Sequence, residues 1–180
     1  MLTRVDEIRQ LASREVYRNP WLRLREDEVE FPDGSRGLFS VVEKPDFVLV
    51  IPYADGGFWL VQQYRYTVGS REWEFPQGAW PAGRDGSPLE LAAAELAEET
   101  GLRAASYTHL GRLFAAYGYC AQSYDIYLAG ELTAGEPDRE HSEMDMVHQW
   151  FPEHDVRAMI KRGEFRDAHS IAALTLFDQR

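Results

Sequence analysis

Cysteine is nearly absent from the sequence, since Cys120 is the only one among 180 residues. A single thiol excludes an internal disulfide and fits a reducing compartment. Cys120 itself is expected to be a small buried apolar residue rather than a nucleophile. The chain must therefore fold around a hydrophobic core. Its length and its 44% of apolar residues allow one domain with a small appendage.

Long apolar runs are also lacking, because no segment is long enough and apolar enough to cross a bilayer. Residues 1–17 carry too many charges for a signal peptide. We therefore expect a cytoplasmic protein with no membrane partner.

Basic side chains are in deficit, with 19 Lys and Arg against 30 Asp and Glu and a net charge of −11 at pH 7. A nucleic-acid backbone needs a basic surface, so we expect no nucleic-acid partner. A phosphorylated small molecule is still compatible with this charge. It needs only a local source of positive charge, either an arginine or a bound metal ion.

Apolar patterns and turn signals predict the order of the elements. The run 47–52 is continuously apolar, which is typical of a strand buried on both faces. Mixed strands between helices predict an α/β fold class, namely an α/β/α sandwich with a mixed β-sheet and a small N-terminal antiparallel β region. We place the boundary so that residues 1–44 form an N-terminal helix and strand region and residues 45–180 the main domain. The expected strands are 22–31, 37–42, 47–52, 58–65, 72–75, 106–116, 123–131 and 146–151, and the expected helices are 2–12, 88–100, 152–162 and 167–177.

The helix expected at 88–100 has start and stop signals that agree with one another. Ser87 is a suitable N-cap, Pro88 suits the first helical position, and Glu90 completes a capping box. Gly101 suits the left-handed position just past the end. Residues at helical spacing are expected to face the core: Leu89, Ala93, Leu96 and Thr100.

Three glutamates, Glu95, Glu98 and Glu99, lie at i, i+3 and i+4 in this helix and so share one face. Like charges at this spacing destabilise a helix by roughly 0.2–0.5 kcal/mol per pair. The helix dipole also disfavours anions near the C-terminal end, and no lysine or arginine in the helix offsets them. A bound Mg²⁺ ion would explain the cluster, because it prefers carboxylate oxygen and shares its remaining positions with water and substrate phosphates. The residues alone leave a solvated acidic face open as the alternative.

The surrounding motifs resemble those of a known family. The segment 95–102, Glu-Leu-Ala-Glu-Glu-Thr-Gly-Leu, resembles the C-terminal half of the Nudix box, G-x5-E-x7-R-E-U-x-E-E-x-G-U, where U is a bulky aliphatic residue. Segments 63–65 and 72–78 resemble the EQYR…ELPAG approach to that box in ADP-ribose and nucleotide-sugar pyrophosphatases. The order of motifs is similar over residues 17–175, which chance would rarely supply. Further similarities lie at 19–21, 32–34, 118–119, 125–129 and 163–173.

The box departs from the family pattern at two positions. Ala94 stands where the family has arginine, and Gly86 stands where it has the first glutamate. If Gly78 is the opening glycine, the loop before the helix is two residues longer. In the family the arginine helps to orient the box carboxylates. Arg71 or Arg84 is a candidate to replace it here.

The resemblance implies a metal-dependent hydrolase that cuts the diphosphate linkage of ADP-ribose or a nucleotide sugar into a nucleoside monophosphate and a sugar phosphate. Glu95 and Glu99 would be the main metal ligands, and Glu98 a further ligand or a catalytic orienting group. The backbone carbonyl of Gln77 or Gly78 would complete the metal shell. Mg²⁺ is the expected ion, with Mn²⁺ as the alternative because both take oxygen ligands.

The general base is expected in the polar loop 134–146. By resemblance Glu143 is the first candidate and Glu140 the second; plain loop solubility is the alternative for both, and for Glu140 it is at least as good an explanation.

Four residues are expected to bind substrate. Arg65 offers a fixed donor fork to a phosphate or ribose, unless it forms a surface ion pair. Trp21 could stack on a base in a pocket completed by a second subunit, unless it only packs in the core or an interface. Gly118 and Tyr119 resemble a substrate loop of the subfamily.

Two other functions remain open. The same chemistry could act on a dinucleoside polyphosphate or a nucleoside triphosphate, although the N-terminal strands favour the first substrate class. Ala94 and Gly86 would suit a non-catalytic module that binds a nucleotide, whereas the intact glutamates argue against it. The resemblance also implies a homodimer that forms through the N-terminal strands.

Overall fold

The computed structural model describes residues 7–81, 83–139 and 144–180. The chain divides into two compact units. The first contains the chain up to Asp46 together with Phe114–Ser123, and the second contains Phe47–Leu113 and Tyr124–Arg180. Each unit is described by itself.

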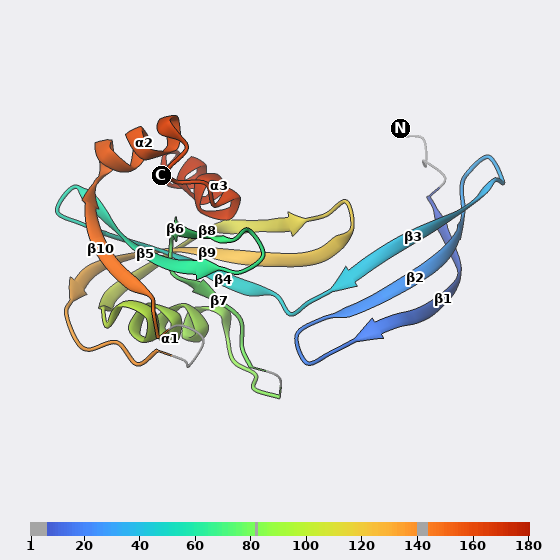
Figure 1. Ribbon diagram of the computed structural model, residues 1–180, viewed down its shortest axis with the longest axis horizontal. Coiled ribbons are helices and arrows are strands. Elements are labelled where there is room, and N and C mark those ends of the chain that lie inside the picture. Colours follow the sequence, from blue (N-terminus) through green and yellow to red (C-terminus); the bar gives the residue numbers. More distant parts are fainter. Residues whose placement is uncertain (1–6, 82, 140–143) are drawn as a thin grey trace. The chain divides into compact units, whose positions relative to one another are not determined.

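The first unit is built on an antiparallel meander of β1 (Arg9–Arg18), β2 (Arg23–Glu30) and β3 (Arg36–Glu43), shown in blue in Figure 1. The helix expected at 2–12 is wrong for residues 9–12, which belong to β1, while residues 2–6 lie outside the described part. Strand pairing explains the difference, because opposite charges such as Arg14 and Glu26 face each other across β1 and β2 at 2.7 Å.

The second unit has a mixed sheet around β4 (Phe47–Ala54). Strand β4 pairs in parallel with β9 (Cys120–Thr133), from Phe47 opposite Tyr124 to Pro52 opposite Ala129. On its other side β4 pairs antiparallel with β5 (Gly57–Arg65), which pairs with β10 (Val147–Pro152) and β6 (Ser70–Glu74). The short β7 (Gln77–Gly78) joins β4, and β8 (Arg103–Ala116) joins β9. Residues 47–52 are buried throughout, as expected of a central strand.

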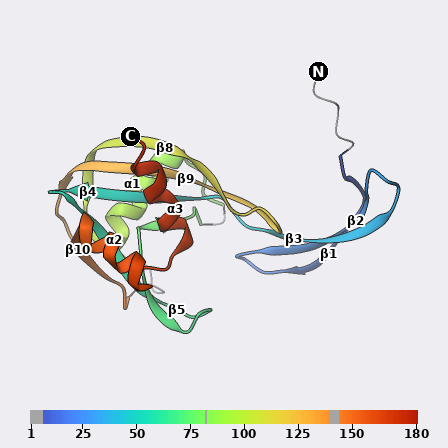
Figure 2. The same ribbon diagram turned by 90° about the horizontal axis from the view of Figure 1, so that it is seen from above.

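Helices cover both faces of this sheet, as Figures 1 and 2 show. Helix α1 (Pro88–Thr100) packs on one face, and α2 (Glu153–Arg162) and α3 (Ala168–Phe177) lie on the other. The predicted α/β/α sandwich with a mixed sheet is therefore confirmed. The core under α1 consists of Val48, Val50, Leu91, Ala92, Leu96, Leu102 and Ala129.

The predicted start and end of α1 are both observed. Ser87 accepts a hydrogen bond from the Glu90 backbone N–H, Glu90 closes the capping box, and Gly101 takes the left-handed conformation with φ of 75°. The predicted core face is wrong in part, since Leu89 is 44% exposed. The helix is rotated so that its buried residues are Leu91, Ala92, Leu96, Glu99 and Thr100.

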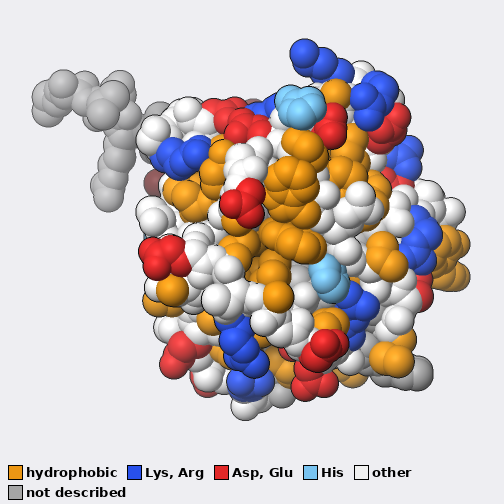
Figure 3. Space-filling model, turned by 90° about the vertical axis from the view of Figure 1, so that its left-hand side faces the viewer, with side chains coloured by type: hydrophobic (Ala, Val, Ile, Leu, Met, Phe, Trp, Pro, Cys, Tyr) orange, Lys and Arg blue, Asp and Glu red, His pale blue; other side chains and the backbone are white. Residues whose placement is uncertain are grey.

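In the part of the chain that the structure describes, no helix has the length and apolar character needed to cross a membrane. Figure 3 shows one face of the molecule, on which lysines and arginines stand in separate groups among acidic and apolar side chains. That face offers a phosphate backbone no continuous basic track. Cys120 is buried, as expected.

Candidate active site

The backbone of β7 lies directly against the carboxylate helix. Gly78 pairs with Val48 on β4, and β7 contacts α1. A Cβ at Gly78 would lie 2.5 Å from both Cδ and Oε1 of Glu95. Real Cβ atoms do not approach so closely, so only glycine leaves the Glu95 carboxylate its present place. Gly78, one of the two residues whose carbonyl was expected to complete a metal shell, therefore lies directly beside Glu95.

The last turn of α1 carries the other two glutamates. Glu99 is only 1% exposed, whereas Glu95 and Glu98 are half-buried. The loop before β10 is attached to this turn, because the Asp138 backbone N–H donates to the Glu98 carbonyl at 3.0 Å. The Arg139 Nε donates to the Glu99 carbonyl at 3.0 Å. A fully solvated acidic face is thus wrong for Glu99, which is enclosed.

A buried polar network connects the strands before α1 to the start of α3. Arg65 Nη2 lies 2.6 Å from both carboxylate oxygens of Glu74, which is 2% exposed. Gln77 Nε2 donates to Glu74 Oε2 at 3.0 Å and to Asp167 Oδ2 at 3.3 Å. Asp167 in turn caps α3 by accepting from the Ser170 backbone N–H. The Gln77 side chain is therefore held from two sides, which fixes the backbone next to Gly78.

The charges of this network extend to α1. Burial raises the pKa of the Glu74 carboxyl above its ordinary value, while its contact with Arg65 opposes that shift. Burial alone would lower the pKa of Arg65, but attraction to Glu74, Glu99 and Asp167 raises it. Arg65 therefore lies within electrostatic reach of Glu99. Its ion pair with Glu74 is partly buried rather than a plain surface pair.

The residues present fit a hard divalent cation. Glu95, Glu98 and Glu99 supply carboxylate oxygen, and Gly78 leaves a cradle next to Glu95 that a Cβ would fill. Among the described residues, no three acidic, imidazole or thiol groups already enclose a metal position. Mg²⁺ suits such an open set, because one or two carboxylates, several waters and substrate phosphates commonly hold it.

Gly86, which replaces the first box glutamate, has a packing role. A Cβ there would lie 2.8 Å from the indole ring of Trp80, which packs against the core under α1. Arg84 stacks over the same ring, 4.1 Å from its centre. Arg71 binds Asp145 at 2.5 Å. Both arginines proposed to replace the box arginine thus have other partners, namely Trp80 for Arg84 and Asp145 for Arg71.

The other predicted residues are distributed between the units. Trp21, 72% exposed, and Gly118 and Tyr119 belong to the first unit, and Arg65 belongs to the second. The exposure of Trp21 argues against core packing. Glu143 and Glu140 lie outside the described residues.

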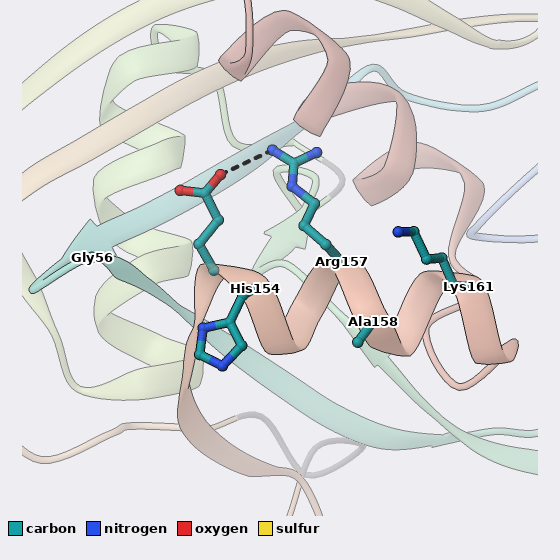
Figure 4. Close-up of a pocket in the computed structure, with 6 residues that line it drawn as sticks. Gly56, His154, Arg157, Ala158 and Lys161 are labelled. Carbon is teal, nitrogen blue, oxygen red and sulfur yellow. Dashed lines mark hydrogen bonds and ion pairs between the residues drawn. The ribbon is translucent and has the colours of Figure 1, made fainter.

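Two polar sites were not predicted from the sequence. Asp125 on β9 accepts a hydrogen bond at 2.8 Å from Arg112 and pairs at 2.8 Å with His109, both on β8. A surface pocket of about 590 Å³ opens on α2 (Figure 4), on the far side of the sheet from α1, where Arg157 is paired with Glu153. Its lining is Gly56, Glu153, His154, Arg157, Ala158 and Lys161.

A carboxylate helix that follows a Gly- and Pro-rich loop, on one face of an α/β/α sandwich, is compatible with a hydrolase of phosphoanhydrides that uses a divalent metal. A model of the NUDIX domain matches residues 43–174, and a model of the nucleoside diphosphate sugar hydrolase N-terminal domain matches residues 8–42. The chain belongs to the Nudix family and is a Nudix pyrophosphohydrolase, as the sequence motifs predicted.

Individual proteins are similar to this chain over most of its length. The chain is 35% identical over 167 residues to the ADP-ribose pyrophosphatase of Mycobacterium tuberculosis, and this alignment covers 91% of this chain and 80% of the relative. It is 27% identical over 131 residues to the methanol dehydrogenase activator of Bacillus methanolicus, and this alignment covers 72% of this chain and 70% of the relative. The crystal structure of an ADP compounds hydrolase shares the fold, with a TM-score of 0.86 at 24% identity over 97% of this chain and 94% of that one.

Proposed function

We propose that the protein hydrolyses the diphosphate linkage of ADP-ribose or a nucleotide sugar, with Mg²⁺, and releases a nucleoside monophosphate and a sugar phosphate. The observation that carries the proposal is the contact between the glycine backbone of β7 and the Glu95 carboxylate, on a helix that also carries Glu98 and Glu99. The name of the relative that is 35% identical supports this substrate class, as does the match of residues 8–42 to a nucleoside diphosphate sugar hydrolase domain.

Each group of the site has a part in this reaction. Glu95 and Glu99 would hold the cation, with Glu98 as a further ligand or orienting group, and the Gln77–Gly78 backbone would add a carbonyl oxygen. A bound divalent ion neutralises phosphate charge and lowers the pKa of a coordinated water. Arg65 has donors that can grip a phosphate while Glu74 fixes its guanidinium.

The remaining roles belong to residues whose placement next to the substrate is proposed. Glu143 accepts the proton of the attacking water, with Glu140 as the second candidate. Trp21 stacks on the base, and Gly118 and Tyr119 line the substrate loop. The exposed indole of Trp21 has the accessible aromatic face that stacking requires.

A substrate panel tests the proposal. Purified protein is incubated with ADP-ribose, several nucleotide sugars, a dinucleoside polyphosphate and nucleoside triphosphates, with Mg²⁺, with Mn²⁺ and with a chelator, and the products are separated. We expect a nucleoside monophosphate and a sugar phosphate, formed only with metal. Preference for a triphosphate or a dinucleoside polyphosphate would support the second enzyme function, and nucleotide binding without turnover would support the non-catalytic module. Glu95→Gln and Glu99→Gln should each lose metal-dependent turnover.

We further propose that the protein is a homodimer formed through the first unit. This unit exposes several large apolar side chains, which a second copy of the chain could cover: Ile8, Val16, Tyr17, Trp21, Leu38 and Phe39. Sedimentation should give twice the mass of the 20.7 kDa chain, and Leu38→Glu should shift it toward the monomer. A monomer at all concentrations would contradict the proposal. We also propose that the protein is cytoplasmic, which cell fractionation would test.

A further inference from the structure

The C-terminal end of α1 concentrates negative charge that the helix does not offset. Glu95, Glu98 and Glu99 lie near the negative pole of the helix dipole, and the last turn contains no basic residue. At the position where the family has an arginine in the box, this chain has Ala94. Some other group must therefore stabilise this end of the helix if the carboxylates are to keep a fixed geometry.

Arg139 reaches the end of α1 from 40 residues along the chain. Its Nε donates to the Glu99 carbonyl at 3.0 Å, one of the carbonyls that a helix end leaves without a partner in the helix. Its Nη1 donates to the Met146 carbonyl, and its Nη2 lies 2.9 Å from Nδ1 of His148 on β10. The planar guanidinium thus connects the last turn of α1 to the start of β10 and adds a positive charge at the negative end of the helix.

The surroundings hold Arg139 in this position. The His148 ring can accept from the guanidinium only when Nδ1 carries no proton, and burial followed by the charge of Arg139 lowers the pKa of this ring. The loop is also pressed closely against the helix end, since a Cβ at Gly135 would lie 2.9 Å from the Gly101 carbonyl. Asp138 donates its backbone N–H to the Glu98 carbonyl, so both terminal glutamates are held through their backbone by adjacent loop residues.

We propose that Arg139 is a positioning residue that takes the place of the missing box arginine and holds Glu98 and Glu99 in a metal-binding arrangement. The inference rests on the proposed function, because it assigns these carboxylates to the metal. Arg139 touches the helix backbone and acts on the carboxylates through it. Glu98 and Glu99, which would bind the metal, would therefore be held in place by Arg139, a side chain outside the Nudix box.

The first test uses Arg139→Ala with Mn²⁺ as the probe ion. Mn²⁺ affinity is measured without nucleotide by electron paramagnetic resonance, and kcat and KM are measured with ADP-ribose. Loss of a group that orients metal ligands typically costs roughly 10–100-fold in metal affinity or activity, so we expect losses of that size in Mn²⁺ affinity and kcat, with KM changed little. The matched control is Arg157→Ala, which removes a half-buried, ion-paired arginine on α2 and should leave both quantities unchanged.

The second test returns the family arginine to the box. In Arg139→Ala combined with Ala94→Arg, we expect partial recovery of Mn²⁺ affinity and kcat, which a purely structural anchor would not show. Should Arg139→Ala fail to fold, Arg139→Lys retains the charge but cannot reach three acceptors at once, and its Mn²⁺ affinity should still fall.

Wild-type affinity in folded Arg139→Ala or Arg139→Lys, or no recovery in the double variant, would overturn the inference. If the metal site itself were wrong, the unmodified protein would bind no Mn²⁺ and hydrolyse no nucleotide, and both proposals would fall.

Discussion

Replacing Gly78 by alanine should separate the geometry of the metal site from the stability of the fold. The added Cβ would lie 2.5 Å from Cδ and Oε1 of Glu95, whereas carbon atoms in contact are separated by about 3.5 Å or more. The carboxylate must therefore move by about 1 Å. A displacement of this size in a catalytic site typically costs roughly 10²-fold in rate.

The effect on stability should be much smaller. The atoms that the new methyl group meets are the end of a flexible side chain, and rotation about its bonds relieves the overlap. We expect a loss of about 0.5–1.5 kcal/mol in the free energy of unfolding, the cost of an off-rotamer side chain. Initial rates of Mg²⁺-dependent hydrolysis, Mn²⁺ affinity and urea denaturation of the same preparations measure the two effects side by side.

The matched control is Gly130→Ala on β9, where the new Cβ would meet only the Ser106 hydroxyl, at 3.0 Å. It should cost similar stability and leave kcat unchanged. If folded Gly78→Ala turned over substrate at the wild-type rate, the contact between β7 and Glu95 would have no bearing on catalysis, and Glu95 would not be held in place by this glycine for the reaction.

Three further predictions concern other parts of the molecule. Gly86→Ala places a Cβ 2.8 Å from the Trp80 ring, and overpacking should lower the free energy of unfolding in urea by about 1–3 kcal/mol; an unchanged value would show that the ring moves freely. Burial and the charge of Arg139 lower the pKa of His148 from its ordinary 6.5 in the folded protein. His148 therefore binds a proton more readily in the unfolded chain. The stability that comes from keeping the ring neutral is complete above pH 6.5 and is lost as the pH falls below it. The melting temperature should then fall more steeply on acidification in the wild type than in His148→Gln, and equal slopes would count against it. Glu143→Gln should slow turnover by roughly 10²-fold if Glu143 is the base, and unchanged turnover would remove it from that role.

Local signals in the sequence were enough to predict α1 and its ends. Ser87, Pro88 and Glu90 act within one turn of the chain, so their effect does not depend on tertiary contacts. The face that α1 turns to the sheet was harder to predict. The expected and observed sets share Leu96 and Thr100, and helical spacing alone cannot decide whether Leu89 or Leu91 completes the buried side.

Long-range contacts account for what was missed. Residues 9–12 join β1 because β2 offers them paired strand positions, and this pairing overrides any local tendency to form a helix. The sequence places Arg139 in a polar loop, since none of its neighbours in the sequence indicates the contact with Glu99, 40 residues earlier. A lone arginine among acidic residues, in a protein whose carboxylate helix lacks a cation, is the signal that could have suggested it.

The departures of the box from the family pattern have different physical meanings. Gly86 is required by Trp80, because any larger residue would collide with a ring that covers the core under α1. The glycine at this position is therefore explained by the packing of the loop against Trp80. Ala94 removes a cation, and Arg139 supplies one at the end of the same helix. With Glu95 held beside the glycine backbone of β7, these exchanges leave Glu95, Glu98 and Glu99 in place on α1, as the proposed metal-dependent hydrolysis requires.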